Sequence, residues 1–192
     1  SEPWAASPSR WWNWPRPRGR RAPIANPPPS GVDVRLARPQ DAAAILAIYN
    51  PEVTSTTHTF DLVPRTLEAQ RRWIAARSGA HPAIVAEQGG EVIGFGSLSP
   101  FRDRPAYATT VEDSVYVAPA ARGTGVGRAL LGELVRLGAV HGFHSVIARI
   151  VGGHEASVAL HRNCGFELVG VEREVGRKLG RWLDVVEMQR LL

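Results

Sequence analysis

The chain contains 192 residues, 44% of them apolar and 21% charged, which is typical of one globular domain rather than two. Of its net charge of +5, four charges arise from residues 1–30, which carry five arginines against one glutamate, so the other 162 residues are left at +1. A nearly neutral domain gives no electrostatic reason to expect nucleic acid, and no apolar run is long enough to predict a membrane span.

The cysteine and histidine content excludes several kinds of site. The single cysteine, Cys164, excludes an internal disulfide and a thiolate metal cage, and it favours a cytoplasmic location. Its position beside Gly165 indicates a packing role rather than a nucleophile. The histidines show no metal-ligand spacing, so no metal site is expected.

Residues 1–30 are predicted to form a Pro/Arg/Trp-rich disordered extension, because eight prolines interrupt any helix or strand and no periodicity is visible. Four tryptophans among the arginines leave binding to RNA or to a membrane surface open as an alternative. Another reading is upstream sequence translated from a misplaced start. The folded domain is therefore expected to span residues 31–192.

The first half of the domain predicts a strand, two helices and a hairpin. The first helix is expected to end before Pro51, since the residue preceding a proline avoids helical geometry. The dipeptide Gly89-Gly90 is typical of a hairpin turn. The expected strands cover residues 32–36, 83–87 and 92–98, and the expected helices cover residues 39–50 and 66–78.

The second half predicts four further strands and two helices, with the last two strands forming an antiparallel hairpin. The strands are expected at residues 110–117, 145–150, 166–171 and 182–188, and the helices at residues 126–141 and 155–163. The order β-α-α-β-β-β-α-β-α-β-β predicts an α/β fold with one mixed sheet and helices on its faces.

The segment Arg122-Gly123-Thr124-Gly125-Val126-Gly127 places three glycines where a strand is followed by a helix. Because glycine has no Cβ, backbone N–H groups can approach a bound anion, and the helix N-terminus adds a partial positive charge. The segment lacks the Lys-Ser/Thr ending of a P-loop and the spacing of a dinucleotide fold. It predicts a phosphate-bearing ligand, although a tight turn that needs glycine for packing remains an alternative.

Two longer motifs resemble the GNAT superfamily of acetyl-CoA-dependent N-acetyltransferases. They are Val117-x-Pro119-x-x-Arg122-Gly123-x-Gly125-x-Gly127 and Leu160-His161-x-x-x-Gly165-Phe166. Within that superfamily the chain is similar to the phosphinothricin and methionine sulfoximine acetyltransferases over residues 48–50, 59–61, 101–102, 110–117 and 180–184.

This resemblance spans residues 32–192 and implies the GNAT acyl-CoA N-acyltransferase fold, with a mostly antiparallel central sheet flanked by helices. It implies an enzyme in which an amine attacks the thioester of acetyl-CoA directly. The acceptor would be the α-amino group of a small amino acid or analogue, and the protein would be a homodimer. A protein N-terminus or a polyamine as acceptor, or a non-catalytic acyl-CoA-binding module, remains an alternative.

The resemblance also implies how acetyl-CoA would be held. Backbone N–H groups of residues 122–127 would bind its pyrophosphate, and the preceding strand would bind the pantetheine arm and the thioester carbonyl. His154 stands where the family usually has asparagine. The expected cofactor-binding residues are Ser114, Val115, Tyr116, Val117, Arg122, Gly123, Thr124, Gly125, Val126, Gly127, His154 and Ser157.

Glu112 and His161 are the expected catalytic residues. An attacking amine must lose a proton, and a carboxylate on an apolar strand is costly to bury unless it is used or paired, so Glu112 is the expected general base. A structural carboxylate bonded to Tyr107 or Thr110 is the alternative. His161 would protonate the departing thiolate, or would only pack or contact CoA.

The expected substrate contacts precede and include this strand. Arg102 would bind an α-carboxylate through its two-pronged donor geometry, with a solvated loop charge as the alternative. Asp113, on the opposite strand face from Glu112, is expected to contact substrate or to lie at the surface. The substrate-binding set is Phe101, Arg102, Asp103, Val111, Glu112 and Asp113.

Overall fold

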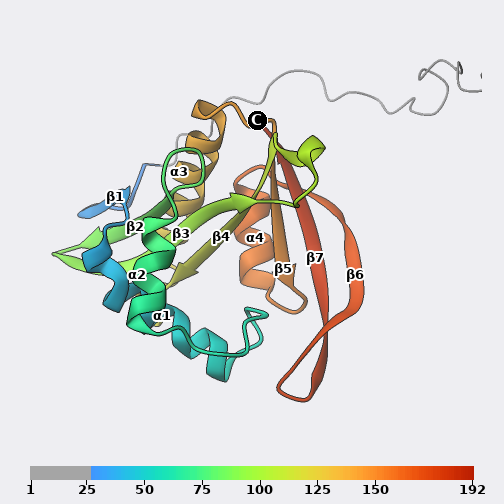
Figure 1. The fold of residues 1–192 in the computed structure, drawn as a ribbon, viewed down its shortest axis with the longest axis horizontal. Helices are drawn as coiled ribbons and strands as arrows, with labels where there is room; N and C mark the ends of the chain where they lie inside the picture. Colours follow the sequence, from blue (N-terminus) through green and yellow to red (C-terminus); the bar gives the residue numbers. More distant parts are fainter. Residues whose placement is uncertain (1–26) are drawn as a thin grey trace, which may run out of the picture.

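A computed structural model describes residues 27–192, and over that range the chain forms one seven-stranded sheet in the order β1-β2-β3-β4-β5-β7-β6 (Figure 1). The pair β4–β5 is parallel and every other pair is antiparallel, which confirms the predicted fold class. The strands are β1 Val32–Leu36, β2 Ala83–Gln88, β3 Glu91–Pro100, β4 Thr110–Val117, β5 Ser145–Val151, β6 Glu167–Lys178 and β7 Arg181–Leu191. The helices are α1 Ala42–Ser55, α2 Leu67–Ala75, α3 Val126–Val140 and α4 Glu155–Asn163.

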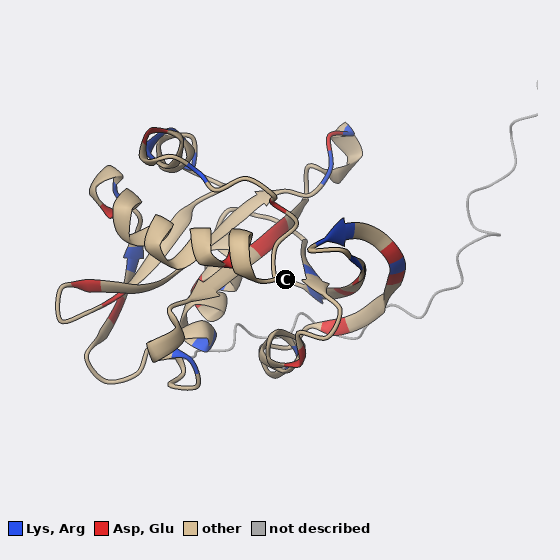
Figure 2. Cartoon of the chain, turned by 90° about the horizontal axis from the view of Figure 1, so that it is seen from below, with Lys and Arg blue, Asp and Glu red and all other residues tan. Residues whose placement is uncertain are grey.

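Helices cover both faces of the sheet, as the alternation along β2 demonstrates. Ile84 and Ala86 pack into a cluster with Leu130 and Leu134 of α3, whereas Val85 packs with Ile45 of α1. Successive side chains of a strand point to opposite faces, so α3 and α1 lie on opposite sides. Lys and Arg positions are interspersed with Asp and Glu positions along the described chain (Figure 2).

The parallel pair β4–β5 is short, and the two strands separate after three paired positions. Thr110, Val111 and Glu112 pair with residues 145–147. Beyond this point β4 remains paired with β3 as far as Val117, and β5 remains paired with β7 as far as Val151. A gap therefore opens in the middle of the sheet, between residues 113–117 and residues 148–151.

The predicted end of the first helix is wrong. The helix α1 continues through Pro51 to Ser55, so the proline lies inside it. Burial of Glu52 and Val53 supplies the reason, because tertiary contacts of the last turn outweigh the local preference against proline. The hairpin β6–β7 is confirmed, and it extends to a turn at residues 179–180.

Residues 1–26 of the predicted extension lie outside the described residues. Its last part, Pro27–Ser30, is described and leads directly into β1. In the described range no helix is both long and apolar enough to cross a bilayer.

Candidate active site

A cavity of about 780 Å³ lies where β4 and β5 separate. Its walls are residues 113–117 of β4, residues 148–151 of β5, the glycine-rich loop and one side of α4. Pro27 and Pro29 also line it. The volume is within the range of pockets that bury a ligand of substantial size.

The glycine-rich loop presents free backbone donors to this cavity. Gly123 and Gly125 have φ values of +77° and +96°, which residues with a side chain rarely adopt. None of the N–H groups of Gly123–Gly125 donates a hydrogen bond to another described residue. These groups adjoin the N-terminus of α3, so the geometry suits a phosphate group. Gly127 serves packing as well, since a Cβ there would lie 3.3 Å from Leu160.

The Arg122 side chain turns away from the loop and binds α1. Its Nη2 lies 2.6 Å from Oε1 of the buried Glu52. The other carboxylate oxygen of Glu52 accepts from Thr56 at 2.8 Å and lies 2.9 Å from His58 Nδ1. Burial alone would raise the pKa of Glu52, but these partners outweigh it and lower the pKa. This cluster fixes the loop to α1.

His154 stacks on His58, with ring centroids 4.0 Å apart and planes inclined by 7°. Burial lowers the pKa of His154 to about 4, and the neighbouring His58 adds to the lowering. His154 is therefore neutral near pH 7. The stack joins the loop after α1 to the start of α4, and both histidines line the cavity.

Asp113 and His161 form a buried pair on the same cavity wall, with His161 Nε2 at 3.1 Å from Asp113 Oδ2. His161 Nδ1 lies 2.7 Å from the Ser157 carbonyl oxygen, so both ring nitrogens face acceptors. Burial alone would lower the pKa of His161, but Asp113 and that carbonyl raise it overall. Of the two placements expected for Asp113, substrate contact or surface, the surface one is wrong, since its side chain is 1% exposed.

A smaller recess of about 240 Å³ lies on the α1 side of the sheet. Glu112 lines it and makes no hydrogen bond or ion pair with any described residue, so the expected alternative partners Tyr107 and Thr110 are not bound. Burial raises the pKa of Glu112, and the positive charge of Arg149 only partly offsets that rise. A carboxylate with a raised pKa and no partner suits a general base.

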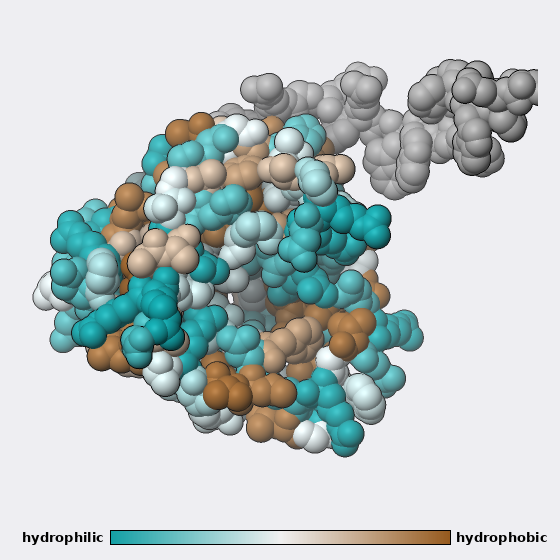
Figure 3. All heavy atoms as spheres, viewed as in Figure 1, coloured by the Kyte–Doolittle hydropathy of each residue, from teal (hydrophilic) through white to brown (hydrophobic). Residues whose placement is uncertain are grey.

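The cavity and the recess meet at the gap between the strands. Both are lined by His58, Ser114, Tyr116, Arg149 and Val151. A hollow is visible near the centre of the face that carries α1 and α2 (Figure 3). A ligand bound in the cavity could therefore contact a second ligand bound in the recess through the gap between β4 and β5.

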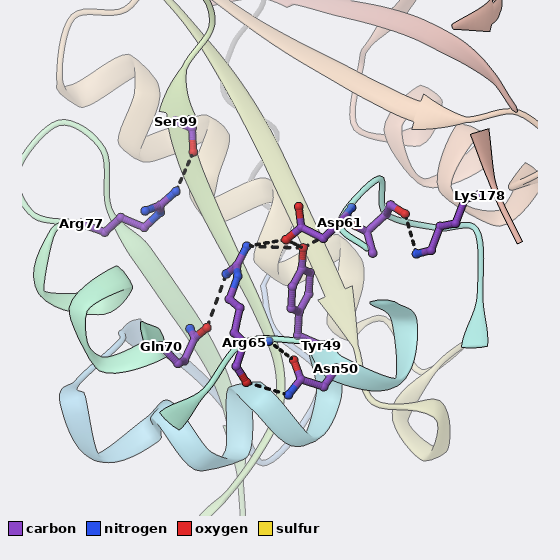
Figure 4. A network of polar contacts seen from close by, with 9 residues as sticks. Tyr49, Asn50, Asp61, Arg65, Gln70, Arg77, Ser99 and Lys178 are labelled. Atoms are coloured by element: carbon purple, nitrogen blue, oxygen red, sulfur yellow. Dashed lines mark hydrogen bonds and ion pairs between the residues drawn. The ribbon is translucent and has the colours of Figure 1, made fainter. Parts of the chain in front are cut away.

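A polar network holds the loop that borders the recess (Figure 4). The Tyr49 hydroxyl donates to Asp61 at 2.6 Å, and the guanidinium of Arg65 lies 4.3 Å from the Tyr49 ring centroid. From β6, Lys178 Nζ donates to the Thr59 carbonyl at 2.8 Å. These contacts join α1, the loop that follows it and β6. The sequence analysis predicted none of these contacts.

Eleven of the twelve expected cofactor-binding residues line the cavity. The exception is Val126, whose side chain is buried in the core beside α3. Of the expected substrate contacts, Glu112 lines the recess and Asp113 lines the cavity. Val111 is 0% exposed within the core, so it offers no surface to a ligand.

The loop residues Phe101, Arg102 and Asp103 line neither the cavity nor the recess. The Arg102 guanidinium lies 4.8 Å from the Phe101 ring centroid and 5.6 Å from that of Tyr107. Arg149 is a site residue that the sequence reasoning missed. Its only sequence signal was a charge inside an otherwise apolar strand, Ser145–Val151.

Comparison with known proteins agrees with this geometry. The acetyltransferase (GNAT) domain family matches residues 34–186. The L-methionine sulfoximine/L-methionine sulfone acetyltransferase of Pseudomonas paraeruginosa is 40% identical over 160 residues, covering 82% of this chain and 93% of its own. The phosphinothricin N-acetyltransferase of Streptomyces coelicolor is 41% identical over 165 residues, covering 84% and 96%. A phosphinothricin acetyltransferase from Sinorhizobium meliloti, solved in complex with AcCoA, superposes with a TM-score of 0.81 at 41% identity, covering 84% and 89%.

Proposed function

We propose, since this chain belongs to the GNAT acetyltransferase family, that it transfers acetyl from acetyl-CoA to the α-amino group of a small amino acid or analogue. The acceptor would be of the phosphinothricin or methionine sulfoximine type, as the names of its relatives indicate. One observation carries the proposal: a cavity with free backbone donors meets a recess with an unpartnered Glu112 at the gap in the sheet.

The proposed chemistry divides between the two sides of the gap. Glu112 accepts a proton from the substrate ammonium group, directly or through water, which leaves an amine able to attack. Backbone groups of β4 that lack a β5 partner beyond Glu112 face the gap and can polarise the thioester carbonyl. His161, held between Asp113 and the Ser157 carbonyl, supplies a proton on the side of the departing thiolate.

Two features favour this acceptor over the alternatives. A recess of about 240 Å³ suits a small molecule better than a protein terminus or an extended polyamine. An unpartnered carboxylate with a raised pKa has a cost that a non-catalytic binding module has no reason to bear. The proposal also includes a cytoplasmic homodimer, and light scattering after size-exclusion chromatography tests the dimer.

Thiol release from acetyl-CoA tests the proposal. The purified protein should release thiol with methionine sulfoximine, phosphinothricin or another α-amino acid in a broad panel. Glu112→Gln should lower turnover by about 100- to 10,000-fold, whereas Glu68→Gln, on the exposed side of α2, should not. Absence of thiol release across the panel would refute the substrate class. Near-normal turnover by Glu112→Gln would remove Glu112 from its role.

A further inference from the structure

Arg149 is the only lysine or arginine among the described residues that lines the recess beside Glu112. It lies on β5, and the residue also lines the larger cavity. Arg149 is therefore at the junction where the two spaces meet. Its side chain is 33% exposed, which leaves it accessible to a ligand.

The register of β4 and β5 places Arg149 on the same sheet face as Glu112. Glu112 pairs with Ile147, and paired residues of a parallel ladder share a face. Arg149 is two residues further along β5, so it returns to that face, and Ser114 does the same on β4. Strand geometry then separates the Cα atoms of Glu112 and Arg149 by roughly 8 Å, before the divergence of the strands adds to it.

The donors of Arg149 are only partly used within the protein. Its Nη2 donates to Oε2 of Glu172 on β6, and its Nε and Nη1 have no partner among the described residues. Glu172 thereby holds the guanidinium from one side. The remaining donors are free to bind an oxyanion in the two-pronged geometry that arginine favours.

An acceptor that carries a carboxylate needs a nearby cation, because the groups around the recess are mainly negative. Glu112 lines the recess without a partner, and the negative charges of Asp113, Glu187 and Glu172 reach its carboxyl, whereas Asp61 is paired with Arg65. This surrounding attracts the ammonium group of an amino acid and repels its carboxylate. Arg102, the residue expected to bind the carboxylate, stacks on Phe101 outside the recess.

We propose that the Arg149 guanidinium binds the α-carboxylate of the acceptor while Glu112 receives the proton of its amine, and that Glu172 positions Arg149. This assignment rests on the proposed function and names the part of the substrate that the recess selects. Only one carbon separates the amine from the carboxylate of an α-amino acid. A base and a cation on adjacent strands, converging on one recess, match that short separation.

The test compares two acceptors that share an amine and differ in charge: L-methionine sulfoximine and its α-carboxamide. Thiol release is measured against concentration of each acceptor. Arg149→Gln should lower kcat/KM for the acid by about 10- to 100-fold, mainly through KM, and change that for the amide less than threefold. Glu172→Gln should give a smaller loss confined to the acid. Arg136→Gln, on the exposed side of α3 and paired with Glu133, is the matched control.

Each outcome decides between the assignments. A wild-type protein that turns over neither acceptor overturns the proposed function, and this assignment with it. An active wild type whose Arg149→Gln variant loses both acceptors equally overturns only the role of Arg149, as does a loss confined to the acid in Arg102→Gln. If Arg149→Gln fails to fold by circular dichroism, Arg149→Lys should still show a partial loss confined to the acid, and an equal loss for both acceptors refutes the role.

Discussion

The buried pair Asp113–His161 should respond very differently to loss of one partner or the other. His161→Leu removes the histidine and leaves the Asp113 carboxylate alone at 1% exposure, with its Oδ1 already lacking a partner. Asp113→Asn keeps the shape and leaves an amide that can donate to His161 Nε2. We therefore expect the histidine substitution to cost more stability than the aspartate substitution.

The magnitude follows from what each substitution leaves unpaired. A buried Asp113 carboxylate that has lost its partner should cost about 3–5 kcal/mol, as is usual when one side of a buried ion pair is removed. An imidazole of ordinary pKa loses its proton at pH 7 almost without cost. Asp113→Asn should then cost about 1–3 kcal/mol, the value of one charged hydrogen bond.

Urea denaturation at pH 7, followed by fluorescence, measures both losses and the double variant. The double variant should be more stable than the sum of the single losses predicts, because no unpaired charge remains. Asp33→Asn, on the exposed edge strand β1, should stay within about 0.5 kcal/mol of the wild type. A larger loss for Asp113→Asn than for His161→Leu, or simple additivity, would refute the reasoning.

Three further outcomes are expected. Because the pKa of His161 is raised on folding, its contribution to stability is complete below the unfolded pKa of about 6.5 and is lost as the pH rises through the folded pKa. Denaturation measured between pH 6 and 9 should show this loss of stability in the wild type and not in Asp113→Asn. Because burial raises the pKa of Glu112 above 4.5, the acid limb of kcat/KM should lie above that value and vanish in Glu112→Gln. Gly125→Ala and Gly142→Ala both force an alanine to a positive φ, +96° and +81° respectively, so each should lower the free energy of unfolding by about 1–2 kcal/mol. Calorimetry should show weakened CoA binding only for Gly125→Ala.

Local sequence patterns predicted those helices and strands whose bounds depend on neighbouring residues alone. The bounds of β4 and α4 were predicted as the structure has them, because alternation and a glycine cap mark them directly. Pro51 was misread, since the contacts that keep α1 helical come from Arg122, 70 residues away. The proline signal was real, but distant packing outweighed it.

The parts of the site that the sequence missed are pairings across the fold. Asp113 and His161 are 48 residues apart, and His58 stacks on His154 across twice that distance in the chain. Neither pair has a motif of its own. The opposite faces of Glu112 and Asp113 were predictable from strand periodicity, but which face held the cavity depended on where α3 and α4 pack.

The position of the glycine-rich loop follows from how closely α3 approaches the sheet. A Cβ on Gly94 or Gly96 of β3 would lie 3.0 Å from Leu130 and Leu134 respectively, so these two glycines let the helix settle against the strand. The same Cβ on Gly96 would lie 3.0 Å from the Ser114 carbonyl oxygen, in the strand that borders the gap. An alanine at either position must therefore push back the leucine side chain of α3 and the facing carbonyl oxygen of β4 by a few tenths of an ångström. Because the free N–H groups of the loop adjoin the first turn of α3, such a shift moves the predicted phosphate site relative to the gap, and core packing and ligand placement change together.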